Sequence, residues 1–138
     1  MPNGTSVTLH MHDSIISFEK FHKYPNFLFQ ALSNTSLVLL CYDLNNSEAL
    51  QNIREWIQLI RSTPKSKGNI CLVGCKSDLP LSVDLTLAKD ITETYNLEFH
   101  EITSAKEMKN VNYLFQHCAD WCYRRAEISQ INSEKEKK

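Results

Sequence analysis

Glycine is scarce in this sequence, whose 138 residues include only Gly4, Gly68 and Gly74. No two of them have the spacing G-x-x-x-x-G-K or G-x-G-x-x-G, so these residues contain no glycine-rich loop of the kind that cradles phosphates. Long apolar runs are absent as well, since none approaches the ~20 residues of a membrane-spanning helix. The first residues also lack the basic flank and apolar region of a signal peptide. We therefore expect neither a membrane span nor secretion.

The sequence has no surplus of charge of either sign. Fifteen Lys and Arg against sixteen Asp and Glu give a net charge of -1, so no overall field draws the chain to nucleic acid or to an anionic membrane. The five cysteines are an odd number, and most lie in apolar runs. This usage favours reduced, buried thiols over a disulfide framework. We expect a cytoplasmic protein without a nucleic-acid partner.

Metal-ligand spacing is also missing. Pairs of candidate ligands do share an element, namely His10 with His12, Cys71 with Cys75, and Cys118 with Cys122. None of these pairs has C-x-x-C spacing or a second pair nearby in sequence, so we expect no metal site. Cys75 is the one thiol whose setting could make it reactive, because the charge of Lys76 beside it would lower its pKa, but we favour a structural role for it. No Ser, His and Asp grouping has a motif that would support hydrolase chemistry.

Hydrophobic periodicity predicts alternating strands and helices. The predicted strands cover residues 7–12, 37–42, 69–74 and 98–102. The predicted helices cover residues 26–32, 49–60, 87–95 and 111–122, and Asn46 or Ser47 is the candidate N-cap of the second one. This alternation is typical of βαβ units, which form a parallel sheet with helices on both faces. We expect one α/β domain over residues 1–126 and a polar, disordered tail over residues 127–138, which ends S-E-K-E-K-K.

Polar motifs follow the predicted strands, at the sheet edge where parallel folds bind ligands. Residues 74–79 read G-C-K-S-D-L, and residues 101–106 read E-I-T-S-A-K. These motifs resemble N-K-x-D and E-T-S-A-K of the Ras-superfamily small GTPases, and Y-D-x-x-N at 42–46, with the helix that follows, resembles the Rab branch. The resemblance implies a partial P-loop NTPase-like fold of three layers, without the central phosphate-loop strand and the first helix.

The resemblance also implies a site for the guanine base. Asp78 would accept hydrogen bonds from the ring and amino nitrogens of guanine, which distinguishes guanine from adenine. The alkyl stems of Lys76 and Lys106 would lie along the two faces of the base. The backbone amides of Ser104 and Ala105 would donate to the exocyclic oxygen of guanine.

Three positions depart from the family pattern. Cys75 stands where the family has Asn, and a thiol cannot supply the hydrogen bonds of an amide. Asp13 matches the magnesium-side Asp of D-x-x-G, but Ile16 replaces its Gly and Ser17 replaces the water-positioning Gln that follows. A β-branched residue resists the backbone conformation that glycine allows. We therefore interpret Asp13 as vestigial.

The phosphate-binding groups of the family have no match in these residues. Phosphoryl transfer depends on those groups for positioning and charge stabilisation. We expect no GTP hydrolysis, weak or absent binding of GTP and GDP, and no bound Mg²⁺. The resulting hypothesis is a pseudo-GTPase that acts on protein partners in membrane trafficking or signalling. No cysteine follows Cys122, so recruitment to a membrane would require a partner and not a lipid anchor.

An alternative reading stays open. The chain would then be a truncated isoform, or an incomplete part, of an active Rab-type switch that binds and hydrolyses GTP. Loss of the central strand would in either case leave two inner sheet edges without partners. Strand 7–12 could pair with strand 37–42, the edge could stay exposed, or another chain could fill the gap.

Overall fold

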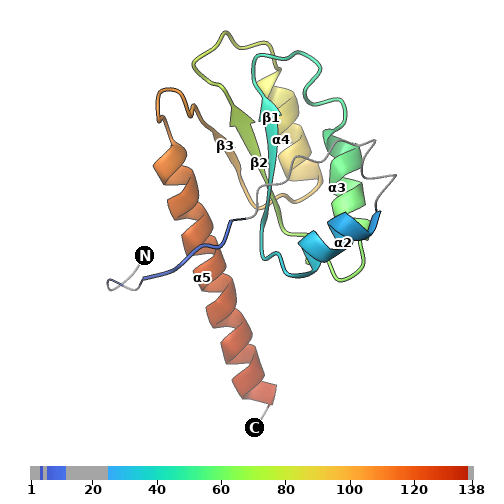
Figure 1. Cartoon of the computed structure of the whole chain (residues 1–138), viewed down its shortest axis with the longest axis vertical. Coiled ribbons are helices and arrows are strands. Elements are labelled where there is room, and N and C mark those ends of the chain that lie inside the picture. Colours follow the sequence, from blue (N-terminus) through green and yellow to red (C-terminus); the bar gives the residue numbers. More distant parts are fainter. Residues whose placement is uncertain (1–3, 5, 12–24, 137–138) are drawn as a thin grey trace.

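The computed structural model describes residues 4, 6–11 and 25–136, and it is an α/β structure around a parallel sheet (Figure 1). The sheet has three strands, β1 (Val38–Asp43), β2 (Ile70–Cys75) and β3 (His100–Ile102), in the order β1-β2-β3. Val38 pairs with Ile70, and Leu72 pairs with His100, both in parallel register. The predicted α/β class and parallel sheet are confirmed.

The burial of each strand follows its place in the sheet. β2 lies in the middle, and its first five residues are all buried, as expected for a continuous apolar run covered on both faces. β1 is partly exposed, and within the described residues it pairs with β2 alone. On its other side β1 therefore has no strand partner among the described residues.

One face of the sheet carries helices α3 (Ile53–Ser62) and α4 (Leu85–Thr94), with α2 (Pro25–Ser33) next to them (Figure 1). Their apolar side chains form one core with the sheet, and its central members are Tyr42, Ile57, Ile60, Ile70, Leu72, Ala88 and Ile91. Gly74 belongs to this face, where an added Cβ would lie 2.9 Å from Cδ2 of Leu44. Glycine at the end of β2 therefore allows the segment after β1 to pack closely.

In the described part of the chain, the opposite face is covered by one long helix, α5 (Val111–Glu136). Leu114 and Cys118 of this helix pack on Cys71 and Val73 of β2, and Leu9 packs against the same cluster. The C-terminal half of α5 projects away from the sheet, and residues 124–136 are exposed (Figure 1). Helices on both faces give the three layers that the sequence predicts. Within the described residues, no helix is both long and apolar enough to cross a membrane.

The N-terminal strand was a wrong prediction over the residues that the structure describes. Residues 7–11 form no strand, and His12 lies outside the described residues. The alternating pattern has a different cause, because Leu9 is partly buried against the β2–α5 cluster while its neighbours His10 and Met11 are exposed. A strand also needs a neighbour for its backbone groups, and β1 does not pair with this segment.

The helix starts also differ from the sequence prediction. α3 begins at Ile53, with Asn52 at the N-cap position, and neither Asn46 nor Ser47 caps it. The side chain of Asn46 instead accepts a hydrogen bond from the backbone N–H of Glu48 at 3.0 Å, which forms a turn before the helix. Side-chain capping competes with such local turns, and here the turn is formed.

α5 is longer than predicted. It continues to Glu136, through most of the segment 127–138 that we predicted as a disordered tail. Glu and Lys are good helix formers, and a helix already nucleated by packing extends at little cost. The division of the chain at residue 126 stays a prediction.

Candidate functional site

The polar residues that follow β2 and β3 meet at the carboxyl edge of the sheet. Backbone hydrogen bonds join the two segments: Thr103 N–H donates to the carbonyl of Gly74 at 2.7 Å, and Ser77 N–H donates to the carbonyl of Thr103 at 3.0 Å. Thr103 is buried, so these bonds are shielded from water. The two motifs found 26 residues apart in sequence, at Asp78 and Ser104, therefore lie in one place.

Asp78 and Ser104 form the centre of this site. The Ser104 hydroxyl donates to Oδ1 of Asp78 at 2.7 Å, and Ser104 itself is fully buried. The same hydroxyl accepts a hydrogen bond from the backbone N–H of Glu107 at 3.2 Å. The Ser104 hydrogen bond, with the nearby charges of Lys106 and Lys76, lowers the pKa of Asp78. Asp78 is thus an ionised, oriented acceptor at neutral pH.

The two backbone amides predicted to face guanine are not equivalent. Ser104 N–H donates to the carbonyl of Lys109 at 3.0 Å, and Lys109 N–H donates back to the carbonyl of Ser104 at 2.9 Å. The Ser104 amide therefore already donates a hydrogen bond within the protein. Ala105 is exposed, and in the part of the chain that the structure describes its amide donates to no other group.

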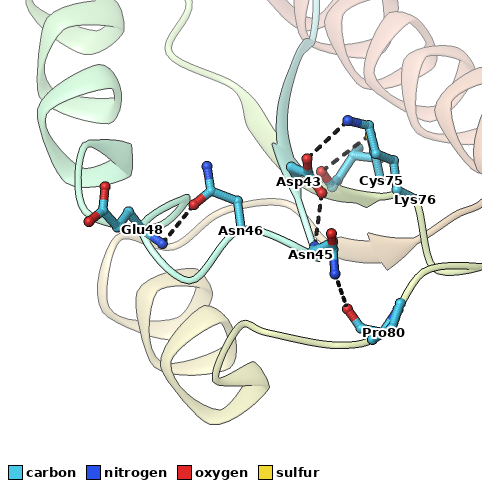
Figure 2. A network of polar contacts seen from close by, with 8 residues as sticks. Asp43, Asn45, Asn46, Glu48, Cys75, Lys76 and Pro80 are labelled. Carbon is cyan, nitrogen blue, oxygen red and sulfur yellow. Dashed lines mark hydrogen bonds and ion pairs between the residues drawn. The ribbon is translucent and has the colours of Figure 1, made fainter.

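Lys76 reaches toward Asp43 at the end of β1 (Figure 2). Its Nζ forms an ion pair with Oδ2 of Asp43 at 2.9 Å, and its backbone has a positive φ of 65°. Asp43 also accepts a hydrogen bond from the backbone N–H of Asn45 at 2.8 Å. That bond and the Lys76 bond lower the pKa of Asp43, and the pairing with Asp43 raises the pKa of Lys76.

Asp43 is a site residue that the sequence reasoning missed. The signal was available, because Asp43 ends the apolar run of β1 and so lies at the same edge as the motifs after β2 and β3. Asn45 fixes the neighbouring loop from the same segment, since its side-chain amide donates to the carbonyl of Pro80 at 2.7 Å (Figure 2).

Cys75 is the last residue of β2 and is half-buried. A hydrogen bond with the Cys41 thiol, a second with Thr103 and the charge of Lys76 lower the pKa of Cys75 to about 7, against the effect of burial. The main cause is the neighbouring Cys41 thiol, and the charge of Lys76, which the sequence suggested, has a smaller effect.

The structure brings most of the predicted residues to one edge. Cys75, Lys76, Asp78, Ser104, Ala105 and Lys106 all lie in the two segments that follow β2 and β3. Asp13, with Ile16 and Ser17, lies outside the described residues. Among the described residues, no group of three or more His, Cys, Asp or Glu side chains could hold a metal ion.

The arrangement of strands, helices and loops has a counterpart among known families. A model of the Ras family matches residues 3–124, which is most of the chain. The chain belongs to the Ras family. The match includes both motif segments and the packed part of α5, and it ends where α5 leaves the sheet. This Ras-family chain is therefore a small-GTPase-like protein with a P-loop NTPase-like fold.

Proposed function

We propose that this Ras-family chain is a Rab-like pseudo-GTPase, which reads the guanine base at Asp78 but does not hydrolyse GTP. The observation that carries the proposal is the 2.7 Å hydrogen bond between Ser104 and Asp78. It joins the two base-reading motifs and holds a carboxylate at the sheet edge where this class of fold binds ligands.

The chemistry of the site favours guanine over adenine. Guanine presents a ring N–H and an exocyclic amino group side by side, and an ionised carboxylate accepts from both. Adenine has an acceptor nitrogen at the matching ring position and is rejected by a carboxylate. The free amide of Ala105 is the donor suited to the exocyclic oxygen, since the Ser104 amide is bonded to Lys109. Lys106 offers an alkyl stem for one face of the base, and Lys76 could offer the other only after leaving Asp43.

The phosphate side of the site is where activity is lost. No glycine-rich loop occurs in these residues, and Ile16 and Ser17 replace the Gly and Gln that act beside the terminal phosphate in the family. Binding energy would then come from the base and ribose alone. We expect weak binding of GTP and GDP, no dependence on Mg²⁺ and no turnover.

The biological role would lie in binding proteins. The Y-D-x-x-N segment at 42–46 and the helix after it are Rab-like in sequence, and they support a setting in membrane trafficking or signalling. We expect such a partner to recruit the protein to membranes from the cytoplasm.

The test is thermal unfolding with GMP, AMP or XMP, measured for the natural chain and for Asp78→Asn. A ligand at ten times its Kd stabilises the native state by about 1.4 kcal/mol. We expect GMP to raise the midpoint of the natural chain and AMP to leave it unchanged. Asp78→Asn should exchange the preference to XMP, because an Asn side chain donates to the carbonyl that xanthine has in place of the amino group.

Asp90→Asn on the exposed surface of α4 is the matched control, and it should keep the GMP response. A cooperative transition that GMP, AMP and XMP leave equally unchanged would contradict base reading. Release of phosphate from GTP above the background of an Asp78→Asn sample would contradict the pseudo-GTPase part and would favour the alternative of an active switch.

A further inference from the structure

Two cysteines lie on the face of the sheet that packs against α5. β1 and β2 are parallel, with Cys41 opposite Val73 and Asp43 opposite Cys75. Side chains alternate between the faces of a strand, so Cys41 and Cys75 project from the same face. The Cys41 thiol is also the largest influence that lowers the pKa of Cys75. Two cysteines from neighbouring strands are thus placed on one face of the native sheet.

The pair is reachable from solvent. α5 covers this face over β2, where Leu114 and Cys118 pack on Cys71 and Val73, and it does not cover Cys41, which is exposed. Cys75 is half-buried beside it. Small oxidants can therefore reach both sulfur atoms without unfolding of the core.

We propose that Cys41 and Cys75 are a redox modification site, in which hydrogen peroxide converts the two thiols into a reversible disulfide. The Cys75 thiolate attacks one oxygen of the peroxide, the O–O bond breaks, and Cys75 sulfenic acid and one water form after uptake of a proton. The Cys41 sulfur then attacks the Cys75 sulfur, and the departing hydroxide takes the Cys41 proton as a second water. Two thiols lose two electrons, and one peroxide gains them.

The roles of the two sulfur atoms follow from their surroundings. Cys75 is the sulfur that ionises near neutral pH, with a pKa of about 7, and Lys76 adds a positive charge next to it. Thiolates and not thiols react with peroxides, so Cys75 reacts first. Cys41 is the resolving thiol, because it lies on the same face of the neighbouring strand.

A second pair on the same face is the internal comparison. Cys71 of β2 and Cys118 of α5 lie in one hydrophobic cluster, and both are buried. The neighbouring Cys118 and burial raise the pKa of Cys71, which keeps it protonated. Proximity alone therefore does not make a cysteine pair reactive. The pair must also be exposed to solvent and include a thiol that ionises.

The disulfide would change the start of the base-reading loop. Diagonal neighbours on adjacent strands have Cα atoms about 7–8 Å apart, whereas a disulfide needs about 4.4–6.8 Å. The backbone must therefore move, and Cys75 is the last residue of β2, directly before Lys76. A strained disulfide is also easily reduced, as a reversible modification requires.

The first experiment maps the oxidised cysteines in the full chain. The folded protein is treated with one equivalent of hydrogen peroxide, the free thiols are counted, and peptides are mapped by mass spectrometry without reduction. We expect two of the five thiols to be lost, a Cys41–Cys75 cross-link to appear, and dithiothreitol to restore both thiols. Cys41→Ser should abolish the cross-link and leave a Cys75 sulfenic acid that dimedone traps.

Cys118→Ser is the matched control, since it removes one thiol of the buried pair and should leave the Cys41–Cys75 cross-link unchanged. Circular dichroism of each variant verifies that it is folded. The proposal is overturned if the first disulfide joins Cys71 to Cys118, if Cys41 cross-links two chains, or if Cys75 is the slowest thiol to react.

A second measurement asks whether oxidation affects base reading, and this consequence rests on the proposed function. We expect the GMP-induced rise of the unfolding midpoint to fall at least several-fold in the oxidised protein and to return on reduction. An unchanged rise in protein with the mapped disulfide would overturn the link. Absence of the rise in reduced protein would instead overturn the proposed function, while the disulfide map would stand by itself.

Discussion

The two faces of the sheet differ in how completely they are covered. Among the residues that the structure describes, the face under α3 and α4 has thirteen buried residues in one cluster, whereas the face under α5 has four. The sheet is the same on both sides, so the difference comes from the helices that the chain supplies. Apolar burial, and hence most of the stability, is concentrated on one face. The exposed thiol of Cys41 and the half-exposed carboxylate of Asp43 lie on the other.

Large-to-small substitutions test this difference most directly. Ile57 of α3 is fully buried in the large cluster, and Leu114 of α5 is buried in the small one. We expect Ile57→Ala to lower the free energy of unfolding by about 4 kcal/mol and Leu114→Ala by about 2 kcal/mol, because the site beside α5 can collapse more easily. Urea unfolding followed by circular dichroism measures both values.

Ile131→Ala, on the exposed projecting part of α5, is the control and should change the free energy of unfolding by less than about 0.5 kcal/mol. Equal losses for Ile57→Ala and Leu114→Ala would show that both faces are packed equally well. The comparison between the faces would then fail.

The fold was largely predictable because its two longer strands are continuous apolar runs in the sequence. The runs at 37–42 and 69–74 are β1 and β2 almost residue for residue. Segment 7–12 was misleading, because alternation of apolar and polar residues reports burial on one side and not the presence of a strand partner. Gly74 shows the same limit, since its close approach to Leu44 is a matter of packing that no motif records.

The site could be predicted where a residue belongs to a local sequence motif. Asp78 and Ser104 were found from their motifs, and their mutual hydrogen bond follows from the parallel sheet. The pairing of Lys76 with Asp43 and of Cys75 with Cys41 was not foreseen, because both pairs join β1 to β2 across the sheet. Strand register decides such contacts, and register is not visible in one strand alone.

A histidine on the well-covered face gives a second, smaller effect that depends on pH. His100 of β3 is hydrogen-bonded through Nε2 to the Tyr42 hydroxyl at 2.6 Å, and burial lowers the pKa of His100. The folded state therefore binds this proton more weakly than the unfolded state does. The stability contributed by neutral His100 is fully present above about pH 6.5 and is lost as the pH falls through the folded pKa.

We expect the free energy of unfolding to decrease as the pH falls below about 6.5, and His100→Gln to flatten this decrease. Urea titrations at several pH values measure the slope. Tyr42→Phe serves as a second variant, which keeps the ring and removes the hydroxyl. A slope that His100→Gln leaves unchanged would mean that burial of this imidazole does not affect its protonation, and that the covered face is more open than the buried cluster indicates.

The ion pair at the exposed edge gives the smallest effect of the three. Lys76 and Asp43 are 2.9 Å apart, but their side chains keep 59% and 33% of their exposure, so water and salt screen the attraction. We expect Lys76→Gln to change the free energy of unfolding by no more than the experimental error. Asp43→Ala should cost more, because it also removes the acceptor for Asn45 N–H that fixes the turn after β1. A double-mutant cycle, measured by urea unfolding at low and high salt, separates the two contributions. A coupling energy that is large and survives high salt would show that this edge is as well shielded as the face under α3 and α4.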